Sequence, residues 1–102
     1  MRDEEVIAGS LLEDACFTLE ELARAAAVSP EWLLARIEEG LLAAGGASAT
    51  QWRFSAVALR RVQRMHAIER AFDAAPELAA LVADLLEEID TLRARVERAR
   101  PL

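Results

Sequence analysis

The chain has 102 residues, of which 54% are hydrophobic, with only four glycines and three prolines. This length allows one small domain with a modest core, and the composition indicates a mostly helical globular protein rather than a disordered one. The net charge of −6 disfavours nucleic acid as the main partner and favours a basic protein surface.

Several classes of protein are disfavoured by what the sequence lacks. Cys16 is the only cysteine, which rules out an intramolecular disulfide and a cysteine-based metal cluster within one chain; we expect a small buried hydrophobe. No apolar run approaches the roughly 20 residues that span a bilayer, and the acidic start does not resemble a secretory signal. His66 is the only histidine, and no nucleophile, base or phosphate loop forms a recognisable set. We therefore expect a cytoplasmic, non-enzymatic protein with no cofactor, metal or small-molecule substrate.

The charge is distributed unevenly along the chain. Residues 1–45 contain ten acidic residues and three arginines, whereas residues 46–102 contain eight acidic residues and nine arginines. The first half is therefore the strongly acidic one, and we expect an electrostatic partner to bind there.

Two helices are predicted in the first half by their end signals. The first follows Thr18, which forms a capping box with Glu21, because each side chain can bond the other residue's backbone N–H. The second covers residues 30–39, with Ser29 as N-cap and Gly40 at the C-terminal end. Residues 1–17 before them are expected to form an arm or a short strand. The apolar residues that share one face of the first helix are Leu19, Leu22, Ala23 and Ala26.

A wing and a third helix are predicted next. Gly45 and the following glycine permit a tight turn, so the run to Phe54 is expected to pair as a short hairpin. We expect Trp52 and Phe54 to fold onto the core rather than form a ligand platform. Ser55 then caps a helix over about residues 56–73. The residues of this helix expected to be buried are Val57, Leu59, Val62, Met65, Ile68 and Phe72.

A fourth helix, over residues 76–100, has the clearest period of the chain. Its apolar residues alternate in spacing between four and three, which makes three heptads of a coiled-coil seam. About 24 helical residues span roughly 36 Å, too far for so small a domain to bury one face. A homodimer, parallel or antiparallel, would bury two such seams at once, and the alternative is that the helix folds back along its own domain. The predicted dimerisation residues are Leu78, Val82, Leu85, Ile89, Leu92 and Val96.

The second helix has the position of a DNA-recognition helix but the wrong charge. Leu33 and Ile37 define its core side, while Glu31, Glu38 and the adjacent Glu39 lie on the outer face. In a DNA-reading protein this face enters the major groove, where carboxylates would be repelled by the phosphates. The helix is therefore predicted to recognise a protein.

These features resemble the winged helix-turn-helix of MerR-type regulators over about residues 17–99. The resemblance rests on the apolar spacing from Leu19 to Leu42, the wing ending in Trp-Arg-Phe-Ser, and the long terminal helix. It predicts a mainly all-α fold with a winged helix-turn-helix domain at 18–73 and a dimerisation helix at 76–100. The family's usual Arg-Tyr-Tyr-Glu begins at Leu34 here as Leu-Ala-Arg-Ile, and Trp52 replaces its wing arginine. Both changes remove arginines that would contact phosphates.

Within this fold the chain is similar to the CbpM family of co-chaperone modulators. The acidic second helix, the Trp52-x-Phe54 pair, the Val-Gln-Arg sequence at 62–64 and the terminal helix carry that similarity. It implies binding to the J-domain of a DnaJ/CbpA-like co-chaperone, which would inhibit its action on a DnaK-type chaperone. J-domains commonly present a basic helix, which an acidic surface with an exposed apolar shoulder could bind. The predicted partner-binding residues are Glu20, Glu21, Glu31, Leu34, Glu38 and Glu39.

Two other functions compete with this interpretation. A MerR-like DNA-binding transcriptional regulator would use arginines of the second helix, the wing and the third helix on DNA. A dimeric scaffold for another partner would bind neither DNA nor a J-domain. The arginines that the DNA-binding alternative would use are Arg36, Arg53, Arg60, Arg61, Arg64 and Arg70.

Overall fold

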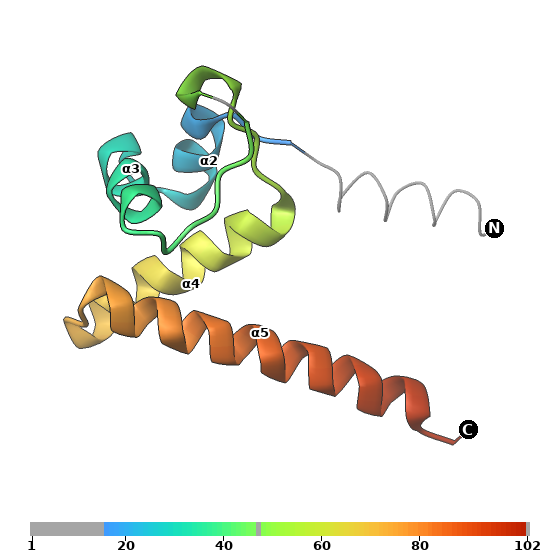
Figure 1. The fold of residues 1–102 in the computed structure, drawn as a ribbon. Coiled ribbons are helices and arrows are strands. Elements are labelled where there is room, and N and C mark those ends of the chain that lie inside the picture. The colour runs from blue at the N-terminus through green and yellow to red at the C-terminus, as the bar shows by residue number, and fades with distance from the viewer. Residues whose placement is uncertain (1–15, 47, 102) are drawn as a thin grey trace. The chain divides into compact units, whose positions relative to one another are not determined.

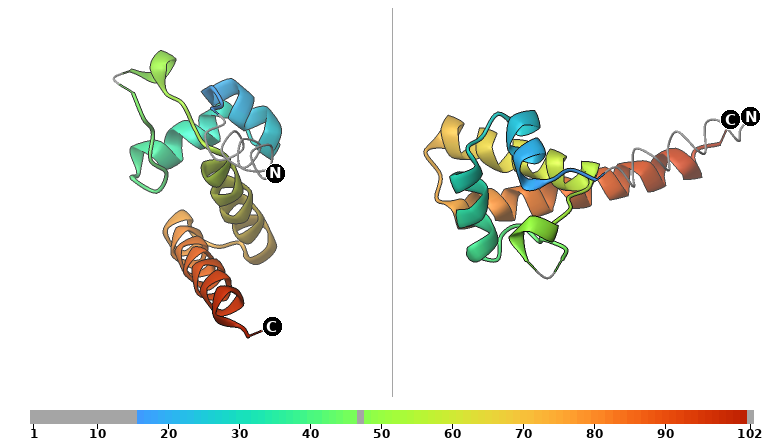
Figure 2. Two further views of the ribbon diagram at one scale, coloured as in Figure 1. Left: turned by 90° about the vertical axis from the view of Figure 1, so that its right-hand side faces the viewer. Right: turned by 90° about the horizontal axis from the view of Figure 1, so that it is seen from above.

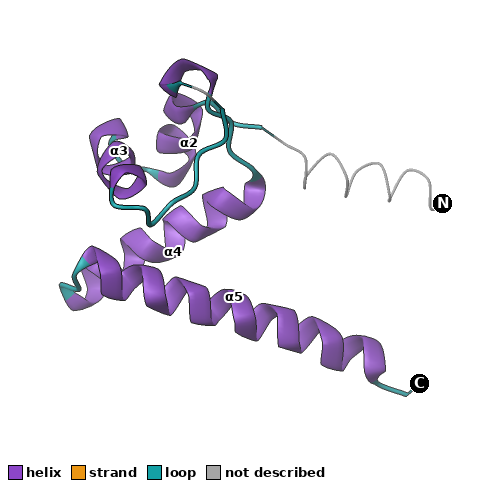
Figure 3. Cartoon of the chain, in the orientation of Figure 1, coloured by secondary structure: helices purple, strands orange, loops and turns teal. Residues whose placement is uncertain are grey.

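The computed structural model describes residues 16–46 and 48–101 of the chain (Figure 1). This part is mostly helical, with short loops between the helices and no sheet (Figure 3). The described part of the chain divides into two compact units, and the boundary between residues 63 and 64 lies within the helix Ala56–Phe72. The elements are α2 (Leu19–Ala26), α3 (Pro30–Glu38), a 3₁₀ helix η1 (Ala49–Gln51), α4 (Ala56–Phe72) and α5 (Pro76–Ala99).

The caps of α2 and α3 are those that the sequence predicts. The Thr18 hydroxyl accepts a hydrogen bond from the Glu21 backbone N–H at 3.1 Å, and the Glu21 carboxylate accepts one from the Thr18 N–H at 2.9 Å. The Ser29 hydroxyl accepts from the Trp32 N–H at 3.0 Å, and Pro30 occupies the first position of α3. Such caps satisfy backbone donors that a helix start leaves unpaired.

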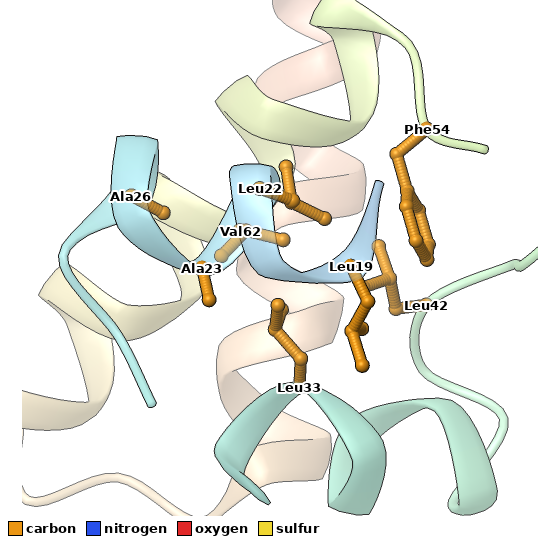
Figure 4. Packing of buried hydrophobic residues seen from close by; sticks show 8 residues of the cluster. All are labelled: Leu19, Leu22, Ala23, Ala26, Leu33, Leu42, Phe54 and Val62. Atoms are coloured by element: carbon orange, nitrogen blue, oxygen red, sulfur yellow. The ribbon is translucent and has the colours of Figure 1, made fainter. Parts of the chain in front are cut away.

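The core of the first unit joins α2, α3, the wing and the start of α4. Leu22 and Leu33 are fully buried, and Figure 4 shows them facing each other and Val62 from three helices. Phe54 is also buried, and Trp52 packs against the cluster, as expected for aromatic residues that fold onto the core. The cluster consists of Leu19, Leu22, Ala23, Ala26, Leu33, Leu42, Phe54 and Val62.

The wing is simpler than a regular hairpin. Its two arms meet at one isolated antiparallel bridge between Gly45 and Arg53, where the Arg53 N–H donates to the Gly45 carbonyl at 3.1 Å. The intervening η1 uses its backbone groups in local hydrogen bonds, so they do not pair across the wing. Gly46 has φ +126°, and a Cβ there would lie 2.7 Å from the Gln51 carbonyl oxygen. Only glycine fits this turn without a shift of the backbone.

The segment before α2 contributes one backbone pair to the first unit. Phe17 and Phe54 form an isolated antiparallel bridge, exchanging hydrogen bonds of 2.8 and 2.9 Å. Cys16 is exposed, so the expectation of a buried cysteine is wrong. Successive residues of an extended segment point to opposite sides, and Phe17 is the one packed against the core. The rest of the predicted arm lies outside the described residues.

The second unit contains the end of α4 and the whole of α5, which is a single unbroken helix of 24 residues (Figure 2). Within this unit, Met65 of α4 is fully buried. An ion pair joins the two helices, because Arg64 Nη2 lies 2.8 Å from Asp90 Oδ2. The face of α5 that is buried is made of small residues, Ala79, Ala80 and Ala83.

Two predictions about the buried face of α4 are wrong. Val57 is 64% exposed and Phe72 is 76% exposed, although both were expected in the core. Val57 lies five residues before Val62, which places it on the opposite side of the helix. Phe72 is the last residue of α4 and lies beyond the buried residues of that helix.

Candidate functional site

The outer face of α3 carries the carboxylates that the sequence predicts there. Leu33 is buried in the core, and this fixes the rotation of α3 about its own axis. Glu31 and Glu38 lie two helical turns apart on the opposite side, with the small Ala35 between them, and both glutamates are exposed. Glu39 follows as the exposed C-cap residue. The result is an acidic ridge, Glu31, Ala35, Glu38 and Glu39, at the position of the recognition helix.

The only basic residue of α3 is turned away from solvent. The Arg36 guanidinium lies 4.4 Å from the centroid of the Trp32 ring, a cation–π arrangement. Its Nη1 also lies 3.7 Å from a Glu39 carboxylate oxygen, and the Arg36 side chain is only 11% exposed. Arg36 therefore does little to offset the negative charge at Glu31 and Glu38.

The remaining predicted partner-binding residues differ in their availability. Glu20 is exposed in the first turn of α2. The Glu21 carboxylate is already engaged as half of the capping box. Leu34 is half-buried and packs against the core of the first unit, so it is not the exposed apolar shoulder that was expected.

Most arginines that a DNA-binding role would use make contacts within the chain. Arg53 Nη1 donates to the Trp52 carbonyl at 2.8 Å, and Arg61 Nε donates to the Leu41 carbonyl at 3.1 Å. Arg64 is paired with Asp90. On α4, Arg60 and Arg70 are the exposed members of the predicted set. Arg36, Arg61 and Arg64 are thus held within the chain, whereas Arg53, Arg60 and Arg70 remain exposed.

A second candidate surface is the apolar stripe of α5. Leu85 is 55% exposed and Val96 is 63% exposed, although both belong to the predicted coiled-coil seam. Ile89, Leu92 and Val96 also line a hollow of about 410 Å³ on this helix. Leu81 belongs to the stripe and was missed by the sequence analysis, although its spacing of four from Leu85 was a usable signal. The exposed stripe consists of Leu78, Leu81, Leu85, Ile89, Leu92 and Val96, and Val82 is half-buried.

Two kinds of site are absent from the described residues. Within 16–46 and 48–101, no group of three or more His, Cys, Asp or Glu side chains could hold a metal ion. In the same part of the chain, no helix is both long and apolar enough to cross a membrane.

Comparison with known proteins agrees with this fold. Residues 17–100 match a family described as MerR HTH family regulatory protein. No curated protein and no solved structure matches the chain significantly. The family match covers most of the chain, from the segment before α2 to the end of α5. The chain therefore belongs to the MerR helix-turn-helix family of regulatory proteins.

Proposed function

We propose that the protein is a CbpM-like modulator that binds the J-domain of a DnaJ/CbpA-type co-chaperone. The observation that carries the proposal is the acidic ridge of α3 in a fold whose recognition helix usually meets DNA. The exposed carboxylates of Glu31 and Glu38 oppose contact with a polyanion and favour contact with a basic helix. The similarity to the CbpM family supports a J-domain as the source of that helix.

The proposed action is steric and electrostatic, without catalysis. Glu31 and Glu38 would attract the basic helix, which raises the rate of encounter. Ala35 between them lets a partner helix approach closely, because its side chain is small. The bound J-domain could then no longer meet the DnaK-type chaperone, so the co-chaperone would be inhibited. Because its proposed partner works in the cytoplasm, we propose that the protein does too.

We further propose that the protein acts as a homodimer through α5. Five exposed residues of α5, Leu78, Leu85, Ile89, Leu92 and Val96, follow the heptad spacing, while the buried face of the helix uses alanines. A pair of such helices would bury both stripes, which the hydrophobic effect favours.

Calorimetric titration with the J-domain of a co-chaperone from the same organism tests the main proposal. We expect a dissociation constant of about 1 µM or lower, which corresponds to about −8 kcal/mol, and weaker binding at higher salt. A folded protein that shows no binding heat with this J-domain would contradict the proposal.

A DNA-binding transcriptional regulator is the second candidate, and the family match favours it as much as the first. Its test is the salt dependence of binding to duplex DNA. A protein that contacts several phosphates shows a steep loss of affinity as salt rises. The co-chaperone proposal predicts no such binding, because the exposed charges of α3 are carboxylates, and Arg36, Arg61 and Arg64 are held by contacts within the chain. A steep slope with tight binding would favour the transcriptional regulator.

A further inference from the structure

A small cleft lies between the start of α2 and the wing, and none of its lining residues belongs to the acidic ridge of α3. Its volume is about 220 Å³, which is below the roughly 300–1,000 Å³ of sites that hold drug-sized molecules. A ligand that fills it is therefore small. The lining residues that matter for its chemistry are Thr18, Leu19 and Glu20 at the start of α2 and Thr50, Trp52 and Arg53 in the wing.

The two sides of the cleft carry the same kinds of side chain. Each side contributes a hydroxyl, an apolar side chain and a charge, and the two charges have opposite signs. Leu19 is buried and Trp52 packs against the core of the first unit, so the apolar part of the cleft is held in place. Glu20 and Arg53 are both exposed, and within the described residues no ion pair joins them. An outside molecule can therefore meet a carboxylate and a guanidinium at one small site.

The guanidinium of Arg53 is oriented by the wing itself. Its Nη1 donates to the Trp52 carbonyl at 2.8 Å and to the Thr50 carbonyl at 3.4 Å. These are the hydrogen bonds of the guanidinium to the described residues, and they leave Nε and Nη2 for an outside acceptor. The edge formed by Nε and Nη2 binds a carboxylate through two parallel hydrogen bonds. Arg53 is therefore oriented in advance to receive a carboxylate, which lowers the entropic cost of binding one.

The carboxylate of Glu20 is the matching group for a cation. The capping box at the start of α2 uses the Glu21 carboxylate, which accepts from the Thr18 N–H, and not the carboxylate of Glu20. The Thr18 hydroxyl accepts a hydrogen bond from the Glu21 N–H, so its own hydrogen remains to be donated. The α2 side of the cleft therefore offers a carboxylate to an ammonium group, together with a hydroxyl donor.

We propose that this cleft binds a zwitterion of amino-acid size, namely an α-amino acid with an apolar side chain. The carboxylate of the ligand pairs with Arg53, its ammonium group pairs with Glu20, and its side chain lies on Trp52. A ligand with a single charge of either sign is attracted by one side of the cleft and repelled by the other, so the site selects a molecule that carries both charges. This site goes beyond the proposed function and does not depend on it.

Titration of the native chain with L-phenylalanine, followed by two-dimensional NMR, tests this assignment. The chain has two tryptophans, so their indole N–H groups give two signals, and Trp32→Phe shows which one belongs to Trp52. We expect the Trp52 signal to shift saturably with a dissociation constant of about 1 mM or lower, while the Trp32 signal stays in place. The absence of a saturable shift at concentrations up to about 20 mM would overturn the site.

Two analogues of the ligand test the requirement for both charges. N-acetyl-L-phenylalanine keeps only the carboxylate, and L-phenylalaninamide keeps only the ammonium group. We expect each analogue to bind about fivefold more weakly than the amino acid, because it loses one attraction and keeps one repulsion. If either analogue binds as tightly as phenylalanine, the cleft recognises a single charge, such as one end of a peptide, and the zwitterion proposal is wrong.

Charge removal on the protein has matched controls in the same chain. Glu20→Gln keeps the shape of the side chain, and we expect it to weaken phenylalanine binding by about fivefold. Glu31→Gln, also exposed in the first turn of a helix, lies outside the cleft and should leave binding unchanged. Arg53→Met should weaken binding by about fivefold, whereas Arg60→Met, at an exposed arginine of α4, should not. Equal losses in a variant and its control would overturn the site.

Discussion

At the scale of single residues, the charge presented by α3 depends on one side chain that turns inward. Arg36 is one of the arginines that a DNA-binding protein of this fold would use. The ring of Trp32 one turn earlier and the Glu39 carboxylate one turn later hold its guanidinium close to the protein surface. Glu31 and Glu38 are left as the exposed charges of this helix.

Glu31→Lys tests the acidic ridge, and Glu77→Lys is a closely matched control. Both glutamates follow a proline at the first position of a helix, and both are exposed. Reversing the charge at the proposed interface should weaken J-domain binding by about tenfold, because an attraction becomes a repulsion. The control should change affinity by less than about twofold. If calorimetry shows the same loss of J-domain affinity for both variants, α3 is not part of the interface.

Ala27 is a second position at which a single residue affects the free energy of unfolding. It ends α2 with φ 59° and ψ 43°, a left-handed conformation that costs a non-glycine residue about 1 kcal/mol. Ala27→Gly should therefore raise the free energy of unfolding by about 0.5 kcal/mol or more. Ala25→Gly, in the exposed last turn of the same helix, should lower it by about 0.5 kcal/mol. Urea denaturation measures both, and the same sign for the two would contradict this account of the cap.

At the scale of elements, the helices were predictable and the wing was not. Helix ends follow from residues three or four apart, such as the pair Thr18 and Glu21, and these appear directly in the sequence. The wing depends on whether its backbone pairs across the turn or locally in η1, which the residue types do not settle. Val57 lies in the first turn of α4 and is exposed. Knowing that a residue belongs to a helix therefore does not reveal which face of the helix it occupies.

The same truncation at two valines of α4 tests the position of the core. Val62 is fully buried in the cluster, whereas Val57 is exposed. Val62→Ala should lower the free energy of unfolding by about 2 kcal/mol, because it removes two buried methyl groups and leaves a cavity. Val57→Ala should change it by less than about 0.5 kcal/mol. Comparable losses in thermal or urea unfolding would mean that the buried face of α4 has been assigned incorrectly.

At the scale of the whole molecule, α5 has an apolar stripe that the described chain leaves exposed. Its heptad spacing was evident from the sequence, and the exposure of Leu85 and Ile89 shows that the stripe is uncovered in the single chain. If the helix folded back along its own domain, only the alanine face would be buried. Under the proposed function, a second copy buries the apolar stripe.

Introducing a charge into this stripe should dissociate the proposed dimer. Leu85→Glu would place a carboxylate in the seam, and we expect the dimer dissociation constant to rise by about a hundredfold or more. Thr91→Glu, exposed on the outer side of α5, should leave the dimer intact. Sedimentation equilibrium measures both variants. A Leu85→Glu protein that remains as dimeric as the native chain would show that the stripe is not the dimer interface.

The sequence by itself determined the helices, their caps, the heptad seam and the acidic α3, because each depends on residues within about one or two turns of one another. Tertiary structure decided which charged side chains remain at the surface. Arg61 finds its carbonyl partner 20 residues away and Arg64 its carboxylate 26 residues away. No local pattern specifies such contacts, since they exist only once packing has brought distant segments together. The same packing turned Leu34 toward the core and left Cys16 and Phe72 exposed.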